Sequence, residues 1–160
     1  MSGTAGRVIQ ADGRSKAYRP LPRPERAAAV RAGLEAYDRG DFFLAHELLE
    51  PAWMGTDDVR ERALIQGLIK LAAADVHGVR GNPAGVARNL EGALERLRQA
   101  AEPAFADRAG ARGLSHLPAD PPDIGVDLDL AAVIAAAEAR FAVARGGGVT
   151  DPITIIWRIP

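Results

Sequence analysis

The chain has 160 residues, of which 48% are hydrophobic but only 5% aromatic, and its formal net charge is −1. This length suits one domain with an aliphatic core of Ala, Leu, Ile and Val. The nearly balanced charge argues against a dedicated nucleic-acid binder. Because the chain contains no cysteine, disulfides, thiolate metal sites and cysteine nucleophiles are excluded.

The chain also lacks the sequence signals of a membrane or secreted protein. No run approaches the roughly 20 apolar residues that a membrane-spanning helix needs. Residues 1–14 contain no apolar stretch of the kind found in secretory signals. We therefore expect a cytoplasmic protein with no membrane partner.

The first 23 residues are basic, with one acidic residue, Asp12, against five basic ones. The basic residues are Arg7, Arg14, Lys16, Arg19 and Arg23. Residues 1–23 are expected to be a poorly ordered leader, or an arm that lies on the acidic surface of the domain. An RNA or an acidic partner is the alternative reason for such a charge.

Residues 24–145 are predicted to form an all-α, single-domain bundle of about five helices. The first helix begins at Pro24, because proline is well tolerated at a first helical position, and it ends at Gly40. Its apolar residues recur at steps of three and four, which gives one buried stripe. The stripe is Ala27, Val30, Leu34 and Tyr37.

The second helix is predicted from Phe42 to about Met54, with Asp41 as its N-cap. Pro51 removes one helical hydrogen bond, so a kink or a restart is expected there. The third helix, over residues 57–80 with Thr56 or Asp57 as its cap, has hardly any polar face. Such a helix is typical of the centre of a bundle.

Gly81, Asn82 and Pro83 mark a helix stop, a cap and the start of the fourth helix. Its buried stripe is predicted to be Val86, Leu90, Leu94 and Leu97, with Arg88, Glu91, Glu95 and Arg98 facing water. The fifth helix is expected over about residues 127–144. Its buried stripe is Leu130, Val133, Ile134, Ala137 and Phe141.

Residues 146–160 form a glycine-rich linker and an apolar tail, in which Ile153, Ile155, Trp157 and Ile159 alternate with other residues. A lone strand has no partner in a helical domain. We therefore expect an extended strap that packs on the bundle. The alternative is that the tail docks on a second copy and forms a homodimer.

Residues 28–100 carry an ordered set of motifs. They are residues 40–50 (GDFFLAHELLE), Trp53, residues 66–69 (QGLI), residues 71–74 (LAAA), His77, Gly81-Asn82 and Gly85. In this combination the chain resembles the uncharacterised domain-of-unknown-function family 309. The resemblance implies a compact helical bundle, found in bacteria and archaea, with no established reaction. Pro51 and Lys70 depart from the family pattern.

The segment His46-Glu47-Leu48-Leu49-Glu50 is similar to the zinc-protease signature His-Glu-x-x-His, but Glu50 stands in place of the second histidine. His46 and Glu50 share one helical face and could hold a divalent metal. Glu47 would then be the general base. Any cofactor is otherwise unknown from the sequence.

An antiparallel hairpin of the second and third helices would place His46 opposite Gln66 and Glu50 opposite Glu61 or Arg62. His77 lies eleven residues beyond Gln66, roughly 16 Å along the helix axis, which is too far for a shared ion. His116 in the long loop lacks neighbouring ligand residues. Asp75 and His77 are expected to be solvated or to cap the helix end.

The candidate polar cluster is His46, Glu47, Glu50, Arg62, Gln66, Lys70 and His77. In it, Arg62 would neutralise Glu50 and Lys70 a second carboxylate. Two hypotheses follow, and the sequence leaves open whether the protein is an enzyme. The favoured one is a non-enzymatic or ligand-sensing module, with an unknown small-molecule ligand, in which these side chains hydrogen-bond to one another. The other is a metal-dependent hydrolase.

Overall fold

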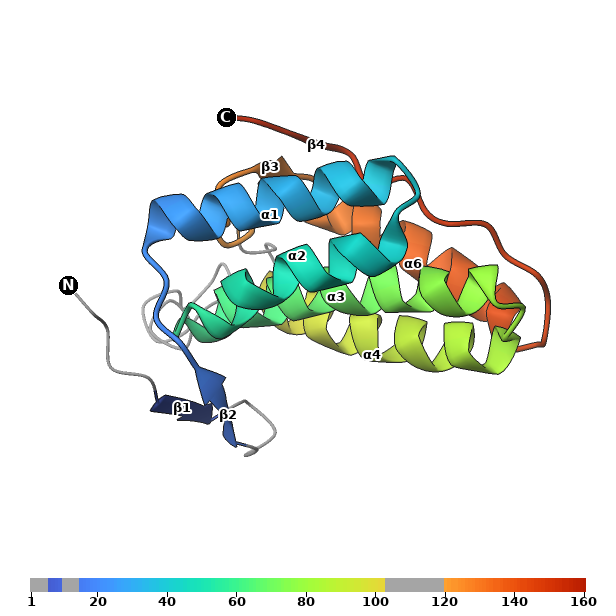
Figure 1. The fold of residues 1–160 in the computed structure, drawn as a ribbon. Helices are drawn as coiled ribbons and strands as arrows, with labels where there is room; N and C mark the ends of the chain where they lie inside the picture. Colours follow the sequence, from blue (N-terminus) through green and yellow to red (C-terminus); the bar gives the residue numbers. More distant parts are fainter. Residues whose placement is uncertain (1–5, 10–14, 103–119) are drawn as a thin grey trace, which may run out of the picture.

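The computed structural model describes residues 6–9, 15–102 and 120–160, and in this part of the chain five helices form one bundle (Figure 1). The helices are α1 (Arg23–Asp38), α2 (Phe42–Met54), α3 (Val59–Val79), α4 (Pro83–Ala101) and α6 (Leu130–Ala144). The predicted all-α bundle of about five helices is confirmed. Among the described residues, no helix is long and apolar enough to cross a membrane.

Helix α3 is the centre of the bundle, as its sequence predicts. Twelve of its 21 residues are buried, because α2 and α4 pack along it. Gly67 allows the close approach of α4, since a Cβ atom there would lie 2.6 Å from Leu97 Cδ2. A side chain at this position would therefore push α3 and α4 apart.

Side-chain caps fix the starts of α2, α3, α4 and α6. Asp41 and Asn82 cap α2 and α4 as predicted, and Gly81 has a positive φ of 67°. The predicted cap of α3 is wrong, because Asp58 accepts the hydrogen bond from the Glu61 N–H. Likewise, α6 begins at Leu130 because Asp129 caps it. Helix α2 continues through Pro51 without a restart.

Two short strand pairs were not predicted. Strands β1 (Gly6–Ile9) and β2 (Ser15–Tyr18) form an antiparallel hairpin within the expected leader. Strand β4 (Trp157–Arg158) pairs with β3 (Asp127–Leu128), so the expectation that the tail has no strand partner is wrong. The β3–β4 pairing joins segments about thirty residues apart, and local sequence patterns do not reveal it.

The C-terminal tail is a strap that packs on the bundle and runs back along α1 (Figure 1). Ile153 and Ile155 are buried in the core, and the half-buried Trp157 donates from Nε1 to Asp38 at 2.9 Å. This confirms the predicted strap. The homodimer through this segment stays a prediction.

A buried polar network ties the strap to three helices. Tyr37 Oη of α1 donates to Asp75 Oδ2 of α3 at 2.6 Å, and the strap carbonyl of Ile153 lies 3.2 Å from the same hydroxyl. Arg140 of α6 pairs with Asp75, with Nη1 2.6 Å from Oδ1, although the N–H does not point along this line. Arg140 Nε also donates to Thr150 of the strap.

The expected solvated or capping role of Asp75 is therefore wrong, since its exposed fraction is only 1%. Burial raises the pKa of Asp75, while the hydrogen bond from Tyr37 and the charge of Arg140 oppose this rise. The pKa of Tyr37 is raised by burial and by the neighbouring Asp75. The three side chains form one unit that no local pattern indicates.

Replacing Asp75 with Asn should lower the free energy of unfolding by about 3–5 kcal/mol, because Arg140 would be left buried without a countercharge. Urea unfolding measures the change. Glu138→Gln is the matched control: it breaks the exposed pair with Arg98 (2.7 Å), and such pairs contribute about 0–1 kcal/mol. A loss in Asp75→Asn no larger than in the control would contradict the stabilising role of the pair.

Candidate functional site

A polar pocket of about 170 Å³ lies between α2, α3 and α4. Four residues of the predicted cluster line it: His46 and Glu50 from α2, and Gln66 and Lys70 from α3. The other lining residues are Trp53, Ile69, Ala73 and Asn89. The α2–α3 hairpin thus brings most of the predicted cluster together, and α4 contributes a polar group that was not predicted.

The α3 side of the pocket follows the stripe of this helix that its neighbours leave partly open. Gln66, Lys70 and Ala73 are half-buried, whereas the α3 residues between them are buried. Their spacing of four and three places them on one helical face. The pocket therefore exists because one stripe of the central helix is uncovered.

On α2, His46, Glu47 and Glu50 form a group that could hold a metal ion. Each offers one ligand atom, and these atoms lie within 4.8 Å of one another. His46 Nδ1 is 3.3 Å from Glu47 Oε1. The His46 and Glu47 side chains are 35% and 51% exposed, so water could complete the coordination of an ion bound here.

The expected hydrogen-bond network among His46, Glu47, Glu50 and Gln66 is not found in the described residues. The bond that joins members of this group is the one between His46 and Glu47. A buried polar network lies instead around Asp75, on a different face of α3. The four side chains therefore remain accessible to a ligand or to water.

Arg62 does not neutralise Glu50, contrary to the prediction. Its side chain turns toward the end of α2, where Nη1 donates to the carbonyls of Trp53 (2.9 Å) and Thr56 (3.0 Å). The guanidinium carbon lies 4.9 Å from the centroid of the Trp53 ring. Burial lowers the pKa of Arg62, which is only 4% exposed. Glu61 pairs with Arg26 and Thr56, so it does not face Glu50 either.

Lys70 lies over a glycine of α4. A Cβ atom at Gly92 would be 3.0 Å from Lys70 Cδ and 3.2 Å from Nζ. The close approach places the lysine side chain between α3 and α4, at the pocket. The expected neutralisation of a carboxylate by Lys70 stays a prediction.

His77 does not line the pocket, as the hairpin geometry indicates, and it is not part of this cluster. It lies near the end of α3, where Nδ1 is 3.2 Å from Asn82 Nδ2 and the ring packs against Gly85. A third ligand from His77 for an ion at His46 is therefore excluded in this arrangement. His116 lies outside the described residues.

Two pocket residues were missed by sequence reasoning. Trp53 packs against the core and also lines the pocket, and its buried Nε1 has no hydrogen-bond partner among the described residues. Asn89 of α4 donates from Nδ2 to the Gly85 carbonyl at 2.9 Å. Its position next to Leu90 of the buried stripe was the one available signal that it faces α3.

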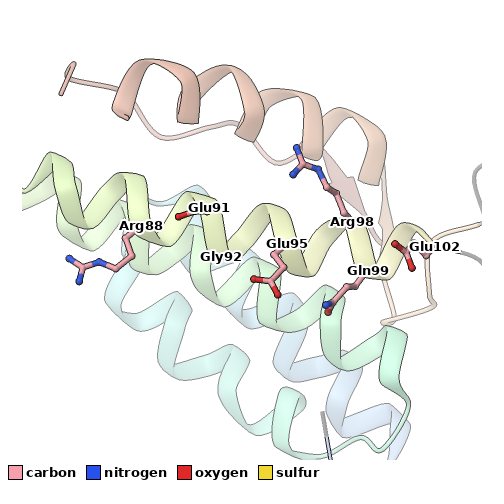
Figure 2. Close-up of a pocket in the computed structure, with 7 residues that line it drawn as sticks. All are labelled: Arg88, Glu91, Gly92, Glu95, Arg98, Gln99 and Glu102. Atoms are coloured by element: carbon pink, nitrogen blue, oxygen red, sulfur yellow. The ribbon is translucent and has the colours of Figure 1, made fainter. Parts of the chain in front are cut away.

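A larger, shallow groove of about 630 Å³ follows the outer face of α4 (Figure 2). Its described lining comes from this one helix. The lining residues are Arg88, Glu91, Gly92, Glu95, Arg98, Gln99 and Glu102. They are mostly exposed charges, so the groove offers fewer convergent groups than the pocket between the three helices.

Together, the fold and the pocket define a small all-α bundle with a polar site on its central hairpin. Residues 30–89 match the family model described as "Domain of unknown function (DUF309)". The predicted resemblance is thus confirmed over these residues, which include all the residues that line the pocket. No curated protein and no solved structure matched the chain in these comparisons.

Because the α2 group is exposed, His46→Ala and Glu47→Gln should each change the free energy of unfolding by less than about 1 kcal/mol. Urea unfolding of both variants beside Asp75→Asn measures this difference. A loss of more than about 2 kcal/mol in either variant would mean that the group is a structural network after all.

Proposed function

We propose that the protein is a non-enzymatic module that binds a small polar molecule in the pocket between α2, α3 and α4. The observation that carries this proposal is the convergence of polar side chains from three helices on one concave site with an apolar part. A mostly formed pocket with a few placed polar groups is the usual form of a ligand site.

The lining groups indicate the kind of ligand. Lys70 can contact a negatively charged group, Glu50 a donor or a positively charged group, and the amides of Gln66 and Asn89 can do either. Ile69 and the Trp53 ring supply apolar contact. The volume of about 170 Å³ is below the roughly 300–1,000 Å³ of pockets for drug-sized ligands. The ligand is therefore a small metabolite.

A thermal-shift screen with small carboxylic acids, amino acids, amines and phosphorylated metabolites tests the proposal. A binding molecule at 100 times its Kd should stabilise the protein by about 2.7 kcal/mol, and calorimetry then gives its affinity. Gln66→Leu and Asn89→Leu should abolish this effect, because each removes a polar group of the pocket.

Gln99→Leu, an amide on the outer face of α4, is the matched control and should leave ligand binding unchanged. Two results would reject the pocket as the binding site. One is that no molecule of the panel stabilises the wild-type protein, and the other is that the stabilisation persists in both pocket variants.

The second candidate is a metal-dependent hydrolase, favoured by the close approach of the ligand atoms of His46, Glu47 and Glu50. In this scheme His46 and Glu50 hold a divalent ion. A bound ion would lower the pKa of a water molecule toward neutrality. Glu47, as the more exposed carboxylate, would accept the proton.

This alternative predicts one Zn²⁺ or Mn²⁺ ion per chain in calorimetric titration of the protein without an affinity tag. His46→Ala and Glu50→Gln should abolish binding, since each removes a ligand. His77→Ala, outside the cluster, should retain it. If the wild-type protein binds neither ion, the hydrolase mechanism is rejected.

A further inference from the structure

Arg62 is a buried cation with two unused hydrogen-bond donors. Only 4% of the residue is exposed, and Nη1 alone of its three side-chain nitrogens is hydrogen-bonded. Nε and Nη2 are buried and have no hydrogen-bond partner in residues 6–9, 15–102 and 120–160, and the same holds for Nε1 of Trp53, whose ring stacks on the guanidinium. Three donors that lack acceptors, Nε and Nη2 of Arg62 and Nε1 of Trp53, therefore belong to two side chains in direct contact.

Two other arginines that contact α3 each have a carboxylate partner. The buried Arg140 is paired with Asp75, and the half-buried Arg26 is paired with Glu61. Arg62 has two carbonyls and an aromatic ring, but no carboxylate pairs with it in the described part of the chain. A buried charge without a countercharge costs several kcal/mol, so an anion at this position would be strongly favoured.

The unused donors have the geometry of an oxyanion site. Nε–H and Nη2–H lie on the same edge of the guanidinium plane and match the two oxygens of a carboxylate or a phosphoryl group. Arg62 precedes Gln66 by one helical turn, so it lies on the same helical face as the pocket stripe but is buried beyond its end. The Trp53 ring contacts both the pocket and the guanidinium.

We propose that Arg62 and Trp53 bind the oxyanion group of the ligand, a carboxylate or a phosphoryl group, through Nε, Nη2 and the indole Nε1. This inference rests on the proposed function, because it assigns the charge of the ligand in that pocket. It adds an anion subsite at the end of the pocket nearest the α2–α3 turn.

The anion reaches the subsite from the pocket side. On the opposite side the main chain is fixed, since Arg19 N–H donates to the Met54 carbonyl (2.9 Å) and Leu21 N–H to the Gly55 carbonyl (3.0 Å). On the pocket side, the Trp53 ring lies between the two, because it both lines the pocket and stacks on the guanidinium. Binding therefore requires this ring to turn, which places a fluorescent reporter at the site.

The chain contains two tryptophans, so Trp157→Phe leaves Trp53 as the sole emitter. This protein is titrated with sodium acetate and with sodium phosphate, with the ionic strength held constant by sodium chloride. We expect a saturable change in Trp53 fluorescence and a rise in melting temperature with one of the two anions. A preference for acetate assigns a carboxylate ligand, and a preference for phosphate assigns a phosphoryl group.

Arg62→Lys in the Trp157→Phe protein keeps the positive charge but removes the paired Nε–H and Nη2–H donors. It should weaken anion binding by about tenfold to a hundredfold. Arg60→Lys is the matched control, because Arg60 lies on the same helix and donates to the carbonyls of Ala100 and Asp120. It should leave the titration unchanged.

No saturable response to either anion in the Trp157→Phe protein would overturn the anion subsite, without the need for an Arg62 variant. Equal binding by Arg62→Lys would overturn it as well. A screened ligand whose binding depends on Asn89 but not on Arg62 would keep the proposed function and reject this subsite. The opposite pattern is an anion response that depends on Arg62 while no screened ligand depends on Asn89 or Gln66. It would keep the anion subsite and reject the proposed function.

Discussion

The burial of α3 is the constraint on which the rest of the structure depends. A charged side chain inside a bundle needs a countercharge or a full set of hydrogen bonds. Near the end of α3, Asp75 meets this need through Arg140 and Tyr37. Near its start, Glu61 meets it through Arg26, while Arg62 keeps two donors that find no partner in the described part of the chain. This difference between the two ends of α3 is the observation on which the proposed anion subsite rests.

The same constraint sets the positions of the other elements. The partners of Asp75 are Tyr37 of α1 and Arg140 of α6. Tyr37 also contacts Ile153 of the strap, and Arg140 contacts Thr150. α1, α6 and the strap therefore cover the face of α3 that carries Asp75. The stripe with Gln66 and Lys70 stays partly open, and the pocket follows it between α2 and α4. Fold and candidate site are thus two consequences of how one apolar helix is covered.

Local signals in the sequence predicted most of the fold. The Asp41 and Asn82 caps and the Gly81 stop depend on nearest neighbours, so they placed the starts of α2 and α4 correctly. Hairpin geometry also predicted that His46 and Gln66 lie on facing helices, and both line the pocket. The pair of Asp75 and Arg140 could not be predicted, because its members lie 65 residues apart and no periodic pattern links them. The prediction that Arg62 neutralises Glu50 was wrong, because the sequence does not show which way a long side chain points. The Arg62 side chain reaches the end of α2 instead.

The most direct test of the anion-binding pocket is a two-dimensional ¹H–¹⁵N spectrum of the arginine Nε–H groups during addition of acetate or phosphate. The Arg62 signal should move and saturate, because a new acceptor would reach its Nε–H. The Arg140 signal, whose Nε–H already donates to Thr150, should stay in place. An Arg62 signal that does not move at anion concentrations that raise the melting temperature would contradict the account.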